Sequence, residues 1–286
     1  MELDDAVAVF NEVRPRLMGI AYRMLGSHAE AEDLVQEVWM RWQAADRSTV
    51  QSPVAYLSTA VTRLAINASQ SARARRETYI GPWLPEPVDT SADPYLGAER
   101  GEALSFAVLL VLERLSPTER AAYILREAFD YPYDELATML QTTLPAVRQL
   151  VSRARKRIRA ERRTEVSGTE QKKLLSAFVE AARSGDLGQL EQLLAKDAIS
   201  YSDGGGVARA SKFPVVGRER VAKYYRAFHT RFWEGVEVEL GAVNGELAAM
   251  CKRDGVLFAV CTIIASADGI DEVLWMMNLS KLSAVA

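Results

Sequence analysis

The spacing of hydrophobic residues divides the chain into three parts. Over residues 4–75, and again over 99–163, apolar positions recur at helical spacing, which predicts amphipathic helices. From residue 170 the pattern changes to a mixture of helices and strands, and Asn244-Gly245 marks a hairpin turn between two of the strands. The sequence therefore predicts a multidomain protein with two all-α domains followed by an α+β domain.

The elements of the third part can be placed approximately. We expect two helices, one strand, a third helix and then four strands. Their expected ranges are 170–184, 186–195, 197–202 and 217–232, followed by 236–243, 246–252, 256–265 and 271–279.

Two polar stretches separate the three parts. Residues 78–98 contain four prolines, which favours an irregular linker. A short polar break at Thr164–Thr169 follows the second helical part. We therefore place the three domains at 1–77, 99–163 and 170–286.

Polar and apolar residues lie on opposite faces of the helix expected over residues 31–42. The apolar face, which should be buried, carries Leu34, Val35, Val38 and Trp42. The polar face carries Asp33, Gln36 and Glu37, and no basic residue interrupts the acidic ones from Glu30 to Glu37. This face is either a solvated surface or a docking surface for a basic helix of a partner protein.

The next helix begins at Pro53, a residue favoured in the first helical turn. Its buried stripe should be Tyr56, Leu57, Ala60, Val61 and Leu64. Its polar positions include four arginines and two amides, namely Arg63, Arg73, Arg75, Arg76, Asn67 and Gln70. Arginines near a helix C-terminus can simply stabilise the helix dipole. Four of them, with no acidic residue from Arg63 to Arg76, indicate phosphate contacts instead, and the two amides can reach base edges.

Residues 133–159 have the pattern of a helix-turn-helix. A short helix at Asp134–Leu140 is followed by a turn at Gln141-Thr142, and Thr143 suits the N-cap of a second helix. The exposed positions of that second helix are Arg148, Gln149, Ser152, Arg153, Arg155 and Lys156. From Arg148 to Arg163 there are eight basic residues and one acidic residue. A basic second helix after a tight turn is typical of insertion into the major groove of double-stranded DNA.

Composition narrows the function further. The chain has 286 residues, 49% of them hydrophobic. Its net charge is −3 although it contains two strongly basic segments. The acidic start is unlike a signal peptide and no apolar run is long enough to span a membrane, so we expect a cytoplasmic protein. Cys251 and Cys261 lie in apolar segments without neighbouring ligands, which favours reduced core residues. We expect no metal and no cofactor.

The two helical parts together resemble an extracytoplasmic-function sigma factor. The resemblance implies that Asp33, Gln36, Glu37 and Trp39 bind core RNA polymerase. It also implies that the segment from Arg63 to Arg76 binds the −10 promoter element, and the segment from Arg148 to Arg157 the −35 element. Asn67 stands where many members of the family carry Asp.

The linker and the third domain extend the resemblance over nearly the whole chain. Trp83-Leu84-Pro85-Glu86-Pro87 is identical to a linker motif of the sigma factors that carry a SnoaL-like C-terminal extension, a cone-shaped α+β domain. Those proteins also share a DGGGK loop and an NPDKL-type string. The corresponding residues here are Asp203, Gly204, Gly205, Gly206 and Val207, and Asn278, Leu279, Ser280, Lys281 and Leu282. We expect these three segments to lie together and to form a regulatory contact.

Three functions remain to be compared. The first is a sigma factor that directs RNA polymerase to promoters and is modulated by its fused C-terminal domain, which could also hold a small-molecule ligand. The second is a helix-turn-helix regulator that senses a small molecule. The third is an isomerase or cyclase with a DNA-binding attachment, for which Asp203, His229 and Asp197 are the acid–base candidates. The acidic face at 30–37 favours the first, because a simple repressor needs no polymerase contact.

Overall fold

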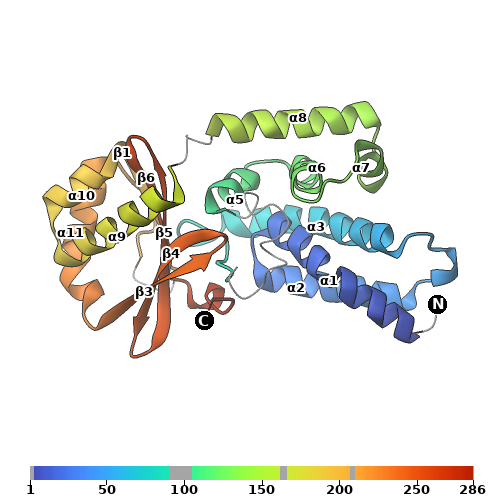
Figure 1. The fold of residues 1–286 in the computed structure, drawn as a ribbon, viewed down its shortest axis with the longest axis horizontal. Coiled ribbons are helices and arrows are strands. Elements are labelled where there is room, and N and C mark those ends of the chain that lie inside the picture. The colour runs from blue at the N-terminus through green and yellow to red at the C-terminus, as the bar shows by residue number, and fades with distance from the viewer. Residues whose placement is uncertain (1–2, 90–104, 162–165, 207–209, 286) are drawn as a thin grey trace. The chain divides into compact units, whose positions relative to one another are not determined.

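The computed structural model describes residues 3–89, 105–161, 166–206 and 210–285 (Figure 1). These residues form two compact units. The helical unit contains the described residues up to Glu77 and from 105 to Glu161. The sheet unit contains the linker from Thr78 and the described residues after 165. The linker therefore packs with the C-terminal domain, and the two helical domains pack with each other.

The first half of the helical unit is a bundle of three helices with a short 3-10 turn. The elements are α1 (Leu3–Leu25), α2 (His28–Ala44), η1 (Arg47–Thr49) and α3 (Pro53–Glu77). The Ser27 hydroxyl caps α2 by accepting a hydrogen bond from the Glu30 amide at 3.2 Å. The predicted core face of α2 is confirmed, since Leu34, Val35, Val38 and Trp42 are all buried.

The predicted stripe of α3 is correct only in part. Leu57 and Val61 are fully buried, but Tyr56 is 37% exposed. Tyr56 lies in the first turn of α3, where its ring leans on Trp42 at a centroid distance of 5.5 Å. Trp42 already fills the interior there and donates its indole N–H to the Ala6 carbonyl. Tyr56 therefore covers the core from outside.

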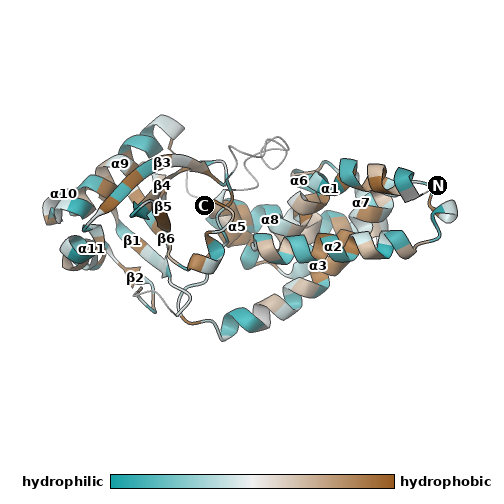
Figure 2. Ribbon diagram, turned by 90° about the horizontal axis from the view of Figure 1, so that it is seen from below, coloured by the Kyte–Doolittle hydropathy of each residue, from teal (hydrophilic) through white to brown (hydrophobic). Residues whose placement is uncertain are grey.

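The second half of the helical unit contains the helix-turn-helix. Its described helices are α5 (Phe106–Glu113), α6 (Pro117–Glu127), α7 (Tyr133–Met139) and α8 (Leu144–Glu161). Apolar residues dominate α5 (brown in Figure 2), and most of them are buried. The Thr143 hydroxyl accepts a hydrogen bond from the Ala146 amide, as expected of an N-cap. Val147, Val151, Ala154 and Ile158 form the buried stripe of α8.

The sheet unit is an α+β domain built on a six-stranded sheet. Its helices are α9 (Gly168–Ser184), α10 (Leu187–Leu193) and α11 (Arg218–Trp233). Its strands are β1 (Leu194–Asp203), β2 (Val215–Val216), β3 (Val236–Val243), β4 (Glu246–Arg253), β5 (Val256–Ser266) and β6 (Gly269–Met276). The strand order is β2-β1-β6-β5-β4-β3, and only β1 and β6 run parallel. The helices gather on one side of the sheet around a shared apolar core (Figure 1).

The end of the chain differs from the prediction. The last strand stops at Met276, and η3 (Leu279–Lys281) follows as a 3-10 helix where we expected a continuing strand. Asn278 is its N-cap and accepts a hydrogen bond from the Ser280 amide at 3.2 Å. This local capping bond competes with strand pairing and turns the chain. The two-residue strand β2 was also missed, because it is too short to show a pattern.

The prediction for the cysteines is confirmed. Cys251 and Cys261 are buried and form no disulfide. Burial raises the pKa of the Cys251 thiol to about 12, so the thiol stays protonated.

Candidate DNA-binding, polymerase-binding and regulatory sites

The exposed face of α2 carries the residues predicted to bind polymerase. Asp33 and Gln36 are exposed, and Glu37 is half-buried and accepts a hydrogen bond from Arg41 at 2.6 Å. Trp39 is half-buried because its ring packs on Phe10 at 4.8 Å. Met40, which the sequence pattern did not single out, is 60% exposed on the same face. Met40 lies one helical turn beyond Gln36, so this face combines carboxylates with an apolar side chain.

The predicted DNA-binding residues of α3 have different surroundings. Asn67 and Gln70 are exposed and available to a partner. Arg75 forms an ion pair with Glu30. The Arg73 side chain lies outside the described residues. Arg63 and Arg76 both contact the second half of the helical unit.

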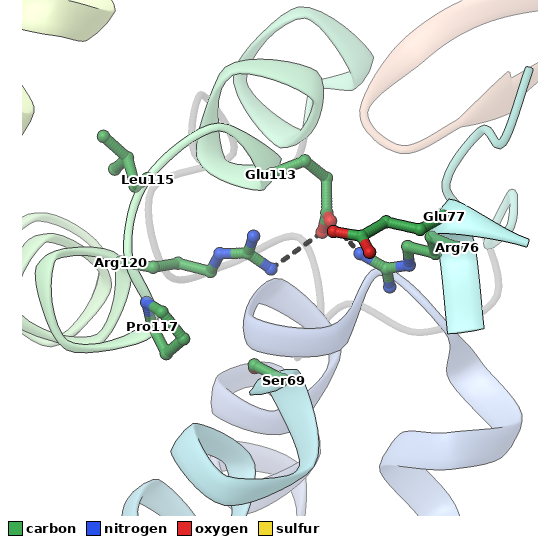
Figure 3. A pocket seen from close by; sticks show the side chains of 7 residues that line it. All are labelled: Ser69, Arg76, Glu77, Glu113, Leu115, Pro117 and Arg120. Atoms are coloured by element: carbon green, nitrogen blue, oxygen red, sulfur yellow. Dashed lines mark hydrogen bonds and ion pairs between the residues drawn. The ribbon is translucent and has the colours of Figure 1, made fainter. Parts of the chain in front are cut away.

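Arg76, Glu113 and Arg120 form what we call the latch (Figure 3). The Glu113 carboxylate on α5 pairs with Arg76 of α3 and, at 2.7 Å, with Arg120 of α6. Arg120 also donates to the Met24 carbonyl at 2.6 Å, and its side chain is almost fully buried. The latch thus ties the helix predicted to bind the −10 element to the domain predicted to bind the −35 element.

Further contacts between the same two domains involve Arg63 and Tyr131. Arg63 of α3 donates to the carbonyls of Met139 at 3.1 Å and Thr138 at 3.3 Å. Tyr131, in the loop before α7, donates its hydroxyl to Ser58 at 2.8 Å. Carbonyl groups at a helix end are acceptors that attract cations. In this arrangement part of the predicted −10 surface is already engaged within the protein.

On α8 the predicted residues fall into two groups. Arg148, Gln149, Ser152 and Lys156 are exposed. Arg153 instead pairs with Glu119 at 2.9 Å, and Arg155 with Glu127 at 2.7 and 3.1 Å. The bond to Glu127 raises the pKa of Arg155 above the ordinary arginine value. The first group forms a polar surface that is ready for DNA, whereas the second is paired with carboxylates of α6, with Arg153 still 59% exposed.

Asp203 and Lys281 form the centre of a contact that we call the clasp, made with the linker residues Tyr79 and Leu84. The Lys281 ammonium donates to Asp203 at 2.7 Å and to the Leu84 carbonyl at 2.6 Å. Asp203 also accepts hydrogen bonds from the Leu84 amide at 2.9 Å and from the Tyr79 hydroxyl. Asn278 donates to the same hydroxyl at 3.0 Å. Burial, together with the bond to Asp203, raises the pKa of Tyr79 well above its usual range.

The structure thus brings the three segments singled out in the sequence together. The Lys281 ammonium lies 4.2 Å from the centroid of the Trp83 ring, within cation–π range. Pro85, Pro87, Gly204 and Leu282 are buried, and Glu86 is half-buried. These contacts hold the linker, the Asp203 loop and η3 against one another.

Glycine is required in the loop after Asp203 for a steric reason. Gly205 and Gly206 have φ values of 60° and 77°, which side chains rarely adopt. A Cβ atom at Gly205 would lie 2.6 Å from the Asn278 side chain, and one at Gly206 would lie 3.1 Å from Ile80. The glycines therefore let the loop approach both the linker and η3.

The linker has a second attachment, at Asn244, that the sequence pattern did not indicate. The Val88 amide donates to the Asn244 side chain, and the Asn244 amide donates to the Val88 carbonyl, both at 2.9 Å. Asn244 has a φ of 55° in the hairpin turn between β3 and β4. A single asparagine in an Asn-Gly turn is fully explained by the turn itself, so the pattern gave no reason to expect a second function.

The acid–base candidates have unrelated surroundings. Asp203 is neutralised by Lys281, Asp197 is exposed, and the His229 ring bonds the Arg226 carbonyl at 2.7 Å. Among the described residues, no group of three His, Cys, Asp or Glu side chains is placed to hold a metal ion. None of the described helices is both long and apolar enough to cross a membrane.

Two family models match the helical unit. Residues 9–76 match Sigma-70 region 2, and residues 105–158 match Sigma-70, region 4. These matches cover the α2 and α3 surfaces and the helix-turn-helix.

Relatives match over most of the chain. The ECF RNA polymerase sigma factor SigJ of Mycobacterium tuberculosis is 38% identical over 251 residues, which cover 85% of this chain and 80% of that protein. The probable ECF RNA polymerase sigma factor SigI of the same species is 31% identical over 98% of this chain and 95% of its own. The crystal structure of the M. tuberculosis extracytoplasmic function sigma factor SigJ superposes with a TM-score of 0.77 at 32% identity, over 97% of this chain and 98% of that one.

Proposed function

Because the chain belongs to the extracytoplasmic-function (ECF) RNA polymerase sigma factors, we propose that its fused C-terminal domain modulates transcription initiation by holding the linker between the two helical domains. The chain is a sigma factor that directs RNA polymerase to promoters. The α+β domain after the helical domains is consistent with the expected SnoaL-like extension. The observation that carries the proposal is the clasp, in which two linker residues bond Asp203.

The clasp limits how far apart the helical domains can move. The linker and the residues after it, 78–104, number 27 between α3 and the start of the second domain. Fully extended, they span up to about 90 Å at roughly 3.4 Å per residue. With residues 78–89 held on the sheet unit, the remaining 15 residues span at most about 50 Å.

The latch also affects the distance between the two helical domains. Arg63 contacts the end of α7, and Arg76 contacts Glu113 of α5, so the two DNA-binding domains lie against each other. Two surfaces in contact cannot reach both promoter elements at once. Opening of the latch therefore precedes promoter binding in this proposal, and the clasp sets how wide the opening is.

Residue roles follow from the same account. The α2 face, with Asp33, Gln36, Glu37 and Trp39, binds core polymerase. Asn67, Gln70 and the α3 arginines bind the −10 element. The exposed α8 residues Arg148, Gln149, Ser152 and Lys156 enter the major groove at the −35 element, while Arg153 and Arg155 exchange their internal carboxylates for phosphates.

The role of the sheet unit in this proposal is regulatory and not catalytic. Its one buried carboxylate in the family motif, Asp203, is neutralised by Lys281 and engaged by the linker, which leaves no free base there. A small-molecule ligand of this unit would act as a signal. Since core polymerase and DNA share the bacterial cytoplasm, the proposal places the chain there as well.

Truncation after Ser167 tests the proposal. The truncated chain keeps every polymerase and DNA surface, so it should still recognise promoters together with core polymerase. The yield of transcript should differ from that of the full chain. Equal yields on every promoter tested would show that the C-terminal domain has no such role.

A further inference from the structure

We propose that Tyr133 positions Arg148 for promoter DNA and so determines how strictly the chain reads one base pair of the −35 element. This inference deepens the proposed function of α8 and rests on it. Tyr133 is the first residue of α7, the helix that precedes α8 in the helix-turn-helix. Its ring is half-buried, and three arginines from α6 and α8 lie around it, namely Arg126, Arg148 and Arg155.

Arg148 differs from Arg153 and Arg155 in what it contacts. Those two arginines pair with carboxylates of α6. Among the residues that the structure describes, Arg148 forms no ion pair or hydrogen bond, and its guanidinium carbon lies 5.7 Å from the centroid of the Tyr133 ring. A guanidinium within about 6 Å of an aromatic centroid is attracted by the ring. The ring therefore orients Arg148 while all five of its N–H donors stay available to DNA.

The Tyr133 ring is itself held by two arginines. The guanidinium carbon of Arg126 lies 5.1 Å from the ring centroid, and Arg126 donates to the Tyr131 carbonyl at 3.0 Å. The Tyr133 hydroxyl bonds Arg155, which Glu127 holds through two contacts of 2.7 and 3.1 Å. These contacts limit rotation of the ring, so it can keep a guanidinium in one plane.

The turn between α7 and α8 sets the distance from Tyr133 to Arg148. Gln141 has a φ of 52°, and the Thr142 amide donates to the Ala137 carbonyl at 2.9 Å, which ends α7 in a tight turn. Arg148 follows in the first half of α8. In a helix-turn-helix it is the N-terminal part of the second helix that contacts base edges. Arg148 is thus both the arginine placed to reach a base and the one that lies on the Tyr133 ring.

Orientation of Arg148 before binding favours base readout over phosphate contact. An arginine reads a base edge through two parallel N–H donors that must meet two acceptors, as at O6 and N7 of guanine. A mobile side chain loses rotamer entropy when it is held in that geometry. A side chain already ordered on Tyr133 has less to lose, so the correct base pair gains affinity. Phosphate contacts carry no sequence information, so binding to unrelated DNA should not depend on the ring.

The test uses the full chain with core polymerase and a library of DNA duplexes of random sequence. Sequencing of the bound duplexes gives the base preference at each position. Arg148→Ala identifies the position that Arg148 reads, because the preference is lost there. Tyr133→Leu should lower the preference at this position about three- to fivefold, the effect of losing an exposed cation–π contact. Tyr133→Phe keeps the ring and should retain most of the preference.

Further readouts separate positioning from a structural role of Tyr133. The affinity for the whole library and its salt dependence should be the same for Tyr133→Leu and the wild type, because no charge is removed. When Arg148 is already alanine, Tyr133→Leu should have no additional effect on base preference. Tyr56→Leu is the matched control, because Tyr56 also lies in the first turn of a helix but packs on Trp42. It should leave the preference at the Arg148 position unchanged.

The outcomes distinguish this inference from the proposed function. If Tyr133→Leu weakens all positions alike, or acts equally with and without the Arg148 side chain, Tyr133 only supports the fold and the inference is overturned. It is also overturned if Tyr133→Phe loses as much preference as Tyr133→Leu. An unchanged preference in Tyr133→Leu, while Arg148→Ala is still effective, overturns the positioning role and leaves the proposed function intact. If Arg148→Ala changes no position, the proposed role of α8 is wrong and the positioning role is wrong with it.

Discussion

Lys281 and Asp203 form an ion pair of 2.7 Å across 78 positions of sequence, and neither side chain is more than 7% exposed. Burying two charges is costly unless their remaining hydrogen-bonding groups are also satisfied. Here the linker satisfies them: Leu84 offers both its carbonyl and its amide, and Tyr79 offers its hydroxyl. The linker therefore supplies three of the hydrogen bonds that stabilise this buried pair, so we expect loss of the pair to release the linker.

Loss of the lysine charge should destabilise the sheet unit. Lys281→Met leaves the Asp203 carboxylate buried without its cation, and we expect a cost of about 3 kcal/mol. Hydrogen exchange of the β5 and β6 core amides measures this cost. Lys252→Met is the matched control, because the side chains of Lys252 and Glu239 are 29% and 54% exposed, and loss of their pair should cost below about 1 kcal/mol. If Lys281→Met and Lys252→Met lower the stability of the sheet unit equally, the account is contradicted.

The polymerase face can be tested by two truncations on α2. Asp33→Ala with Gln36→Ala should weaken binding to core polymerase by about tenfold, since truncation of central interface residues costs over about 1 kcal/mol. Both side chains are exposed, so the fold should be unaffected. Glu32→Ala, on the same helix, removes an exposed carboxylate that pairs with Arg14 and should change binding less. If the double variant co-purifies with polymerase as well as the wild type does, α2 is not the docking surface.

The orientation of α8 on DNA can be tested at Arg148. This side chain is exposed beside the Tyr133 ring, and Arg148→Ala should cost about 1–3 kcal/mol in promoter binding if it reads a base edge. A role limited to phosphate would weaken all sequences alike and lower the salt dependence. Arg114→Ala removes an exposed arginine at the C-cap of α5 and serves as the control. If Arg148→Ala changes neither the affinity for promoter DNA nor the salt dependence of binding, another face of α8 binds DNA.

Release of the latch should separate the helical domains. Glu113→Gln removes the charge shared by Arg76 and Arg120, so the population of open molecules should rise. Fluorescence energy transfer between dyes on α2 and α8 reports the separation. Glu161→Gln is the control, because Glu161 also bonds two arginines, Arg114 and Arg157, but within one domain. The same distance distribution in both variants would mean that the latch does not hold the domains together.

Much of this fold could be predicted from local sequence. The 3.6-residue pattern predicted the α2 core, and Asn244-Gly245 predicted the hairpin between β3 and β4. These features depend on neighbouring residues, which is why a pattern predicts them. The resemblance to a family pointed to the three segments of the clasp.

The pairing of single polar residues could not be predicted. Arg155 and Arg153 belong to the same basic block as Arg148, yet tertiary contacts hold them on Glu127 and Glu119 while Arg148 is exposed. Pairing of this kind depends on how α6 and α8 approach each other, which no local pattern encodes. Tyr79 and Asn244 were missed for the same reason, because each is a lone residue whose partner lies more than 100 positions away.

The most direct test of the regulatory role is transcription from a series of promoters in which the spacer between the −10 and −35 elements varies by single base pairs. The clasp limits the reach of the linker, so wild-type protein with core polymerase should transcribe well at a narrow range of spacer lengths. Lys281→Met releases the linker and should transcribe over a broader range, with changes of about fivefold or more at the longest spacers. Lys252→Met should match the wild type. Identical spacer profiles for wild type and Lys281→Met would contradict the central claim that the C-terminal domain acts through the linker.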